Sequence, residues 1–467
     1  MSNDMNRRDL MKRAGALGLS AAALAKLGQV YAQDASPAAT PAASPVVDTS
    51  VSGELNIAMV ANPQMVALQK LSGEFQKQYP NIKLNLLVLP ENEIRDRIRT
   101  DVSTQATQFD VVTIGMFEAA DYAKQGWTLD VGTPLQGDAG YDFADIFPAM
   151  VSALSGDDGK LYAAPFYGES CMLYYRKDLF QAAGLTMPEK PKWSEIAEFA
   201  AKLYKKEGPY GIALRALPGW GEFGAPLTAT MNAFGGRWFD DQWKSQLASE
   251  KSAAGIKFYT DLLINFGQPG ATTSGFTECE NLFVQGKTAM WMDATSAADL
   301  LGDPALNPQA ANTGFAYPPS EEIESGWLWA WAFAIEKGTK HQDAALAFVK
   351  WATSKDYVQL VSEQLGWGSV PSGVRSSTYA DAGYKDYAKG FADLVLSIIQ
   401  AQDPTKCCVD AVPYKGLQFV GVPEFVTLGD SVTKELADVI AGNQKIEDAI
   451  KKVDDMANQW AIENGYQ

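Results

Sequence analysis

The chain has 467 residues, of which 46% are apolar and 20% are charged. This composition is typical of globular proteins, and the length is sufficient for two or more domains. The formal net charge is −17, so the surface repels nucleic-acid phosphates, and no nucleic-acid partner is expected.

The N-terminus carries the pattern of an export signal over residues 1–32. Arg7 and Arg8 stand side by side, a mostly apolar stretch follows over residues 14–27, and Val-Tyr-Ala then offers a cleavage site. This pattern is typical of a twin-arginine signal peptide, whereas a membrane span needs about 20 consecutive apolar residues. We therefore expect an exported protein, periplasmic or associated with the cell surface. The Ala/Pro/Ser-rich residues 33–53 are expected to form a flexible tail.

Strands and helices alternate after this tail. Apolar runs predict strands over residues 54–60, 82–88 and 110–114, and helical spacing predicts helices over 65–79 and 91–106. This alternation is typical of a parallel sheet, so the predicted fold class is α/β. In open sheets of this kind, ligands bind beyond the carboxyl ends of the strands.

Further elements of both kinds follow along the rest of the chain. The predicted strands are residues 210–214, 288–292, 314–317 and 329–335, and the predicted helices are 194–205, 226–234, 252–265, 342–353, 387–399, 424–441 and 445–462.

Residues 161–180 (LYAAPFYGESCMLYYRKDLF) contain the first candidate ligand site. Tyr167 and Glu169 lie between two apolar runs. An aromatic ring can cover the apolar face of a sugar or polyol, and a carboxylate can accept hydrogen bonds from two neighbouring hydroxyls. A crossover strand with a structurally satisfied glutamate would show the same pattern.

Further candidates follow the three N-terminal strands. Asn62 follows the first strand, and Glu91 and Asn92 follow the second. Arg95 lies one helical turn beyond Glu91, and Phe117 follows the third strand. Amide, carboxylate and guanidinium groups at strand ends can bind vicinal hydroxyls. The alternative is structural, with the asparagines as helix caps and the two charged residues as a surface pair.

Trp220 lies in GWGEFG (219–224), which follows a predicted strand and precedes a predicted helix. This segment matches the Gly-x-Gly-x-x-Gly motif of dinucleotide sites, with Asp240 about 20 residues further on. Trp220 and Glu222 would crowd a pyrophosphate, so we favour a tryptophan that stacks on a ligand. A tryptophan at the edge of the core is the alternative.

Trp327, Trp329 and Trp331 alternate, so on a strand they share one face. At least one of them is expected in the core, and Trp329 is the preferred ligand contact. Asp293, in WMDAT (291–295), follows a buried strand and is either a ligand-binding carboxylate or a helix cap.

Few residues suit catalysis or metal binding. His341 is the only histidine, so a multi-histidine metal site is excluded, and no Gly-x-Ser-x-Gly segment occurs. The four cysteines, Cys171, Cys279, Cys407 and Cys408, include no Cys-x-x-Cys pair. Cys171 is expected to be a small buried side chain, and a disulfide from Cys279 to Cys407 or Cys408 is left open.

Short motifs are distributed over nearly the whole chain after residue 53. They are QFDVVTIGMFE (108–118), KQGW (124–127), AAPFYGES (163–170), YRKDLF (175–180), GWGE (219–222), GRWFDDQW (236–243), WMDAT (291–295), WLWAW (327–331), WATSKDY (351–357) and VPYKGLQFVGVPEF (412–425). Together they resemble the polyol-binding branch of the extracellular solute-binding proteins, the receptors of ATP-binding cassette (ABC) importers. Any one motif alone would be a weak signal.

The resemblance implies a type II periplasmic-binding-protein fold with two discontinuous lobes joined by a hinge. We expect residues 54–163 and 313–383 in the first lobe and 164–312 and 384–467 in the second. The turn at Asp293 would face the cleft between them. The implied function is a monomeric, non-enzymatic receptor without cofactor or metal. It would bind a sugar alcohol such as sorbitol or mannitol, or a small sugar, and deliver it to a membrane permease.

Two other functions stay open at this point. One is a secreted carbohydrate-active enzyme with Glu169 and Asp293 as its carboxylate pair. The other is a dinucleotide-dependent polyol dehydrogenase that uses the glycine motif. Turnover of the ligand would indicate the first, and nicotinamide binding the second.

Overall fold

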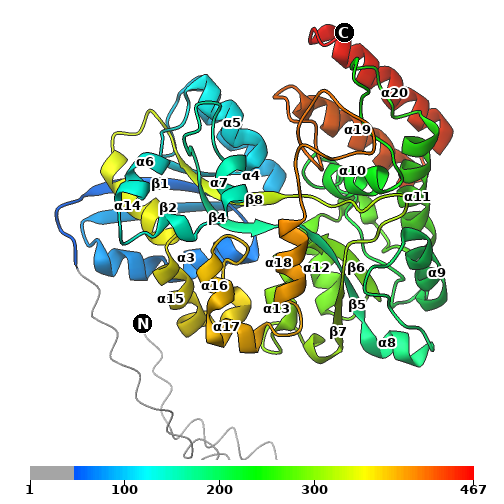
Figure 1. Ribbon diagram of the computed structural model, residues 1–467, viewed down its shortest axis with the longest axis horizontal. Coiled ribbons are helices and arrows are strands. Elements are labelled where there is room, and N and C mark those ends of the chain that lie inside the picture. The colour runs from blue at the N-terminus through cyan, green and yellow to red at the C-terminus, as the bar shows by residue number, and fades with distance from the viewer. Residues whose placement is uncertain (1–46) are drawn as a thin grey trace, which may run out of the picture. The chain divides into compact units, whose positions relative to one another are not determined.

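The computed structural model describes residues 47–467, so the predicted signal peptide lies outside the described residues. The chain begins with β1 (Gly53–Val60), α3 (Pro63–Gln78), β2 (Ile82–Leu89), α4 (Glu91–Thr104) and β3 (Val111–Ile114) (Figure 1). The predicted alternation of strands and helices is thus confirmed, with ends that differ by a few residues.

Residues 48–53, which the sequence analysis assigned to a flexible tail, are held in place by backbone hydrogen bonds. The N–H of Asp48 donates to the carbonyl of Gln78 at 2.7 Å, and the N–H of Gly53 donates to the carbonyl of Asn81 at 3.1 Å. These backbone bonds attach residues 48–53 to the end of α3 and the residues just after it. The Ala/Pro/Ser-rich composition before them gives no sign of this attachment.

The larger sheet has five strands in the order β2-β1-β3-β8-β4. β1 pairs in parallel with β2 and β3, while β8 (Trp329–Ile335) runs antiparallel to β3 and to β4 (Ala164–Glu169). The chain moves from β1 outward to β2 and then back to β3. Right-handed crossovers therefore place α3 and α4 on opposite faces of the sheet.

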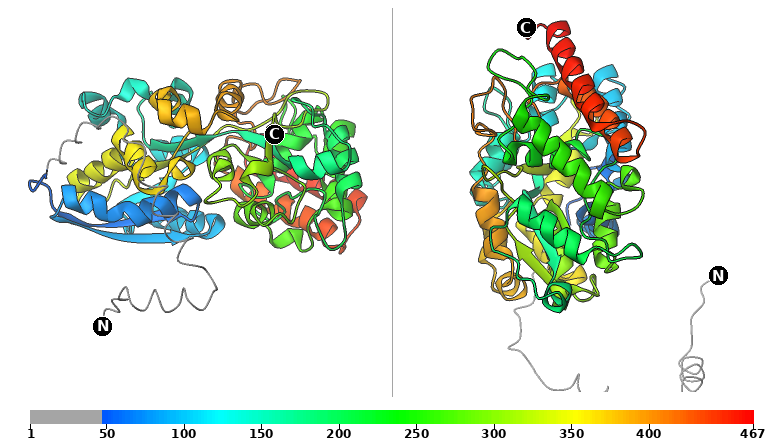
Figure 2. Two further views of the ribbon diagram at one scale, coloured as in Figure 1. Left: turned by 90° about the horizontal axis from the view of Figure 1, so that it is seen from below. Right: turned by 90° about the vertical axis from the view of Figure 1, so that its right-hand side faces the viewer.

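This sheet is covered on both faces, which explains why its inner strands are mostly apolar. α3 and α14 (Gln342–Ala352) pack against each other over one face (Figure 2, blue and yellow), and α4 packs on the other. All residues of β3 and β8 are buried. The elements packed around this sheet form the first lobe.

The smaller sheet has three antiparallel strands in the order β6-β5-β7. They are β5 (Cys171–Arg176), β6 (Met290–Ala294) and β7 (Thr313–Ala316). Only Ser170 separates β5 from β4 of the larger sheet, so the chain passes directly from one sheet to the other (Figure 1). The elements around this smaller sheet form the second lobe.

Helices make up most of the rest. The longer ones are α5 (Met116–Gln125), α9 (Trp193–Leu203), α10 (Gly224–Ala233), α11 (Glu250–Phe266), α12 (Phe276–Val284), α15 (Lys355–Leu365), α18 (Ala392–Gln400), α19 (Phe425–Ile440) and α20 (Ile446–Glu463), and the shorter ones are α6 (Gly132–Gly137), α7 (Pro148–Ala153), α8 (Lys177–Ala182), α13 (Ala297–Gly302), α16 (Ser376–Ala380) and α17 (Ala382–Tyr387). Within residues 47–467, no helix combines the length and apolar character that a membrane span requires.

The predicted strand over residues 210–214 is wrong. Tyr210 and Ala213 form only isolated bridges to Thr288 and Trp291. The segment is apolar because it is buried against β6 rather than because it pairs continuously.

Strand pairing also differs from the predicted division of the chain at two places. The prediction assigns residues 164–169 to the second lobe, yet β4 pairs with β8 in the larger sheet. It assigns residues 313–316 to the first lobe, yet β7 pairs with β5 in the smaller one. Both segments lie where the chain crosses between sheets, and an apolar strand looks the same in either. The remaining boundaries stay a prediction.

Candidate functional site

Strands β4 and β8 together supply one wall of a cavity. Tyr167 pairs with Trp331 and Glu169 pairs with Trp329, so these four side chains project from the same face of the larger sheet. All four line the cavity. The ring of Trp329 lies where a side chain on Gly115 would be, so only glycine leaves room for it.

The first lobe contributes residues that follow β1 and β2. Asn62 and Gln64 lie at the start of α3, and Glu91 and Arg95 lie in the first turns of α4. Nδ2 of Asn62 donates to the Tyr167 hydroxyl at 2.6 Å. These positions are the carboxyl ends of parallel strands, where ligands are expected.

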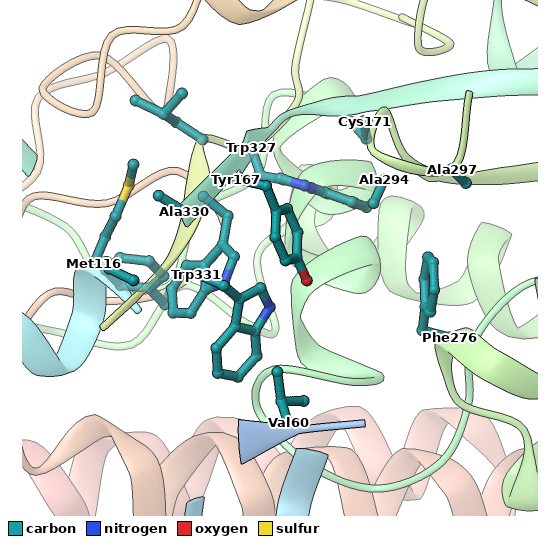
Figure 3. Close-up of a cluster of buried hydrophobic side chains, with 14 of the residues drawn as sticks. Val60, Met116, Tyr167, Cys171, Phe276, Ala294, Ala297, Trp327, Ala330 and Trp331 are labelled. Atoms are coloured by element: carbon teal, nitrogen blue, oxygen red, sulfur yellow. The ribbon is translucent and has the colours of Figure 1, made fainter. Parts of the chain in front are cut away.

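The second lobe and the segment after α18 complete the cavity, whose space measures about 530 Å³ including its mouth. The lining residues are Asn62, Gln64, Glu91, Arg95, Tyr167, Glu169, Arg215, Trp220, Gly221, Ala225, Phe276, Ser296, Trp327, Trp329, Trp331 and Gln418. Figure 3 shows the side chains of Tyr167, Trp331 and Phe276 around a common space. Aromatic walls with a few polar groups are typical of small-molecule sites.

Hydrogen bonds between the two lobes lie next to this cavity. Nε2 of Gln64 donates to the Ser296 carbonyl at 3.2 Å, and Nδ2 of Asn92 donates to the Pro218 carbonyl at 3.0 Å. Each bond joins a helix start in the first lobe to a loop of the second. The cavity is therefore enclosed by residues from both lobes.

Arg95 lies among three tryptophan rings. Its guanidinium carbon is 4.7 Å from the ring centre of Trp220, 5.1 Å from that of Trp329 and 4.6 Å from that of Trp331. Nε donates to Glu91 at 3.2 Å, and Nη1 is paired with Glu118. The rings and carboxylates hold one flat cation at the edge of the cavity.

Arg215 is the other arginine that lines the cavity. Its Nε donates to Oδ2 of Asp293 at 2.9 Å, Nη2 is paired with the other oxygen, and Nη1 donates to Glu222 at 3.4 Å. Asp293 also accepts from Trp291 Nε1 at 3.0 Å and from the N–H of Ala294 at 2.7 Å. Asp293 is completely buried, and its oxygens are occupied by these donors.

Glu169 is protonated more readily than an exposed glutamate. Burial raises the pKa of Glu169 to about 8, although the Ser296 hydroxyl donates to it at 2.5 Å and Arg215 favours the charged form. Burial followed by repulsion from Glu91 likewise raises the pKa of Glu222 to about 7. Without ligand, the cavity therefore favours a neutral Glu169 near pH 7, rather than the carboxylate that the sequence suggested.

The structure brings together most of the predicted site residues. Those that line the cavity are Asn62, Glu91, Arg95, Tyr167, Glu169, Trp220 and Trp329. Asn92, Phe117 and Asp293 do not. Asn92 bonds to Pro218, Phe117 packs behind Trp220 with ring centres 4.6 Å apart, and Asp293 is paired with Arg215.

Several lining residues were not predicted. They are Gln64, Arg215, Gly221, Ala225, Phe276, Ser296, Trp327, Trp331 and Gln418. A signal existed for three of them, because Trp327 and Trp331 share the alternation of Trp329 and Ser296 follows WMDAT directly. Phe276 comes from a segment without a distinctive sequence, whereas Gln418 lies in the motif VPYKGLQFVGVPEF (412–425), to which no binding role was assigned.

Comparisons with known proteins agree with this arrangement. The family model described as bacterial extracellular solute-binding protein matches residues 61–359. The chain belongs to this family. As a solute-binding protein it has the predicted two-lobed fold, which is confirmed by solved relatives: a maltose-bound MalE3 of T. maritima has a TM-score of 0.73 at 21% identity and covers 86% of this chain and 98% of its own.

Three further similar proteins carry names that mention a ligand. The mannitol-binding protein of Pseudomonas aeruginosa is 42% identical over 400 residues, which are 85% of this solute-binding protein and 90% of that one. An ABC transporter solute-binding protein of Agrobacterium vitis S4 with bound D-mannitol is 44% identical, has a TM-score of 0.86 and covers 88% of this chain and 99% of its own. An erythritol/L-threitol-binding protein of Mycolicibacterium smegmatis is 25% identical, over 65% of this chain and 67% of that one.

Proposed function

We propose that this solute-binding protein is the receptor of an ABC importer for an acyclic sugar alcohol of the mannitol or sorbitol class. The observation that carries the proposal is the 44% identical structure with bound D-mannitol, which matches this chain over 88% of its length. The receptor would capture its ligand outside the cytoplasm and release it to a membrane permease.

The cavity has the groups that such a ligand needs. A hexitol presents C–H groups along its chain and a hydroxyl on each carbon, so it needs aromatic surfaces beside donors and acceptors. Trp220, Trp329 and Trp331 supply the surfaces. Asn62, Glu91 and Glu169 supply polar groups from different sides of the cavity.

Gln418 adds an unsatisfied acceptor to this set. Its Nε2 donates to the Leu328 carbonyl at 3.0 Å, while its Oε1 is buried and has no hydrogen-bond partner within residues 47–467. A buried acceptor without a partner costs about 1–3 kcal/mol, which a ligand hydroxyl would recover.

Ligand binding would favour the closed arrangement of the lobes. Asn62, Gln64, Glu91 and Arg95 approach the cavity from the first lobe, and Arg215 and Ser296 approach it from the second. A ligand that contacts both sides stabilises only the form in which they are close, so it shifts the population toward closure.

Thermal denaturation with a ligand panel tests the proposal. The panel contains mannitol, sorbitol, ribitol, erythritol, glucose and maltose. A ligand at 100 times its dissociation constant should add about 2.7 kcal/mol of apparent stability. We expect the hexitols to give the largest shift. A shift with maltose alone, or with none of the polyols, would reject the proposed ligand class.

The alternative of a carbohydrate-active enzyme has less support. It needs Glu169 and Asp293 as a pair facing the substrate, yet Asp293 lies behind the cavity lining in its bond to Arg215. Incubation with glycosides and polyols, followed by chromatography, should return each compound unchanged. Detection of a product would reinstate the enzyme.

A further inference from the structure

The segment between α18 and α19, residues 401–424, contains no helix or strand, yet it takes part in the cavity. It supplies Gln418 to the lining, and the ring of Phe419 lies 5.9 Å from that of Trp220 and 6.1 Å from that of Trp329. Nδ2 of Asn232 holds it to α10 through the Leu417 carbonyl at 2.9 Å.

Cys407 and Cys408 lie side by side in this segment. Their Sγ atoms are 2.7 Å apart, well inside the contact distance of two nonbonded sulfur atoms. Cys407 is buried, and Cys408 is partly exposed and within 3.9 Å of Asn232 Oδ1. The other two cysteines, Cys171 and Cys279, are fully buried free thiols, so the disulfide from Cys279 that the sequence left open is not formed in this structure.

The surroundings favour oxidation over metal binding. Within residues 47–467, no group of three or more histidine, cysteine or acidic side chains is arranged to hold a metal ion. The hydrogen bond from Cys408 lowers the pKa of Cys407, which favours a thiolate at one sulfur next to a thiol at the other. A thiolate is the form that attacks a disulfide.

We propose that Cys407 and Cys408 form a disulfide between neighbouring residues once the protein meets a disulfide oxidant outside the cytoplasm. One thiolate attacks a sulfur of the oxidant, which forms a mixed disulfide and releases one thiol. The second thiolate then attacks the first cysteine sulfur and releases the other thiol. The protein loses two hydrogen atoms and is oxidised, while the oxidant disulfide is reduced to two thiols.

The disulfide would act locally. A cross-link stabilises a protein mainly by closing a loop of the unfolded chain, and neighbouring residues enclose almost no chain. The bond would instead restrict the backbone at residues 407–408, within the segment that places Gln418 and Phe419. This proposal does not depend on which solute the cavity binds.

Alkylation and mass spectrometry test it on the full protein. Trypsin cleavage after Lys406 and Lys415 releases residues 407–415, CCVDAVPYK. This peptide contains Cys407 and Cys408 and no other cysteine. The protein is equilibrated with oxidised glutathione, unfolded, alkylated with iodoacetamide and digested. We expect this peptide about 2 Da below its dithiol mass and without alkyl groups, and with two alkyl groups after prior reduction.

The remaining cysteines provide internal controls. The peptides 161–176 and 258–287 contain Cys171 and Cys279 respectively, and each should take one alkyl group with or without prior reduction. Three results would overturn the proposal: two alkyl groups on residues 407–415 without reduction, glutathione attached to that peptide, or a cross-link between it and 258–287. Cys408→Ser should bind one alkyl group or one glutathione at Cys407, because the second thiol is gone.

Discussion

Arg95 is mostly buried and Arg215 is buried; both are paired with two carboxylates and lie next to aromatic rings, yet they are held differently. Arg95 is stacked among Trp220, Trp329 and Trp331 at the edge of the cavity. Arg215 is bound at Nε and Nη2 by Asp293 alone, whose oxygens are already occupied. Arg95 is thus arranged around the ligand space, and Arg215 around the interior of the second lobe.

The difference indicates that a buried ion pair can serve either binding or folding. A buried charge without its partner is strongly destabilising, so both arginines need their carboxylates. Rings beside both arginines line the cavity, but Arg95 is held at the cavity wall by its rings, whereas Arg215 is fixed by Asp293, which does not line the cavity. Changes at Arg215 should therefore affect stability first, and changes at Arg95 should affect affinity first.

The largest effect is expected from Asp293→Asn. The amide keeps the shape of the side chain but removes the charge that neutralises Arg215, and breaking such a buried pair typically costs about 3–5 kcal/mol. Chemical denaturation should show this loss in free energy of unfolding.

Asp261→Asn is the matched control for that variant. Asp261 pairs with Lys257 on the surface of α11, where ion pairs contribute about 0–1 kcal/mol. Adding Arg215→Met to Asp293→Asn should restore part of the stability, because the unpaired cation is then removed. Equal losses for Asp293→Asn and Asp261→Asn would mean that the Arg215 pair contributes no more than a surface pair.

Arg95→Lys should weaken ligand binding more than it lowers stability. Lysine keeps the charge but loses the planar group that stacks on the rings and binds two carboxylates at once. Loss of hydrogen bonds to charged groups suggests a cost of about 1.5–3 kcal/mol in affinity, measured by titration calorimetry with mannitol. Arg97→Lys, at an exposed pair with Glu93 on the same helix, should bind normally. Native affinity in Arg95→Lys would remove Arg95 from the site.

The sequence revealed Arg95 but not Arg215, for a physical reason. Glu91 and Arg95 are four residues apart on one helix, so their contact follows from helical geometry. Asp293 is 78 residues from Arg215 in the chain, and no local pattern reports that contact. The α/β alternation was likewise predictable from hydrophobic spacing, whereas the pairing of β4 and β7 depended on tertiary structure.

The same limit explains why Asp293 was placed in the cleft. The sequence predicted that it follows the strand, but β6 extends to Ala294, so Asp293 is the second-last residue of the strand itself. Whether its carboxylate faces a ligand or an arginine depends on Arg215, which approaches from a segment that is not a regular strand. Tyr167 and Glu169, by contrast, are two residues apart on β4, so strand alternation alone places both on the face that lines the cavity.

Glu169→Gln should weaken binding at least tenfold, or about 1.4 kcal/mol. The hydroxyls of a bound polyol would donate to the ionised carboxylate and lower its pKa from about 8. Binding then releases a proton near pH 7, so affinity should rise as the pH increases from 6 to 9.

Calorimetry in two buffers of different ionisation enthalpy measures that proton release. Glu169→Gln should bind with the same weak affinity at each pH, because the titrating group has been removed. A pH-independent affinity in the parent protein would show that Glu169 keeps its proton when the ligand binds.

The smallest effect is expected from Asn92→Ala, which separates closure from ligand contact. Asn92 does not line the cavity, but its side chain joins α4 of the first lobe to the Pro218 carbonyl of the second. Losing one neutral hydrogen bond from the closed form should lower affinity by about 0.5–1.5 kcal/mol. Because the bond belongs to the closed protein and not to any ligand, the loss should be the same for mannitol, sorbitol and every other solute that closes the lobes. Asn62→Ala, at a residue that does line the cavity, should instead change affinity by different amounts for different polyols. A loss in Asn92→Ala that varies from ligand to ligand would place Asn92 at the ligand after all.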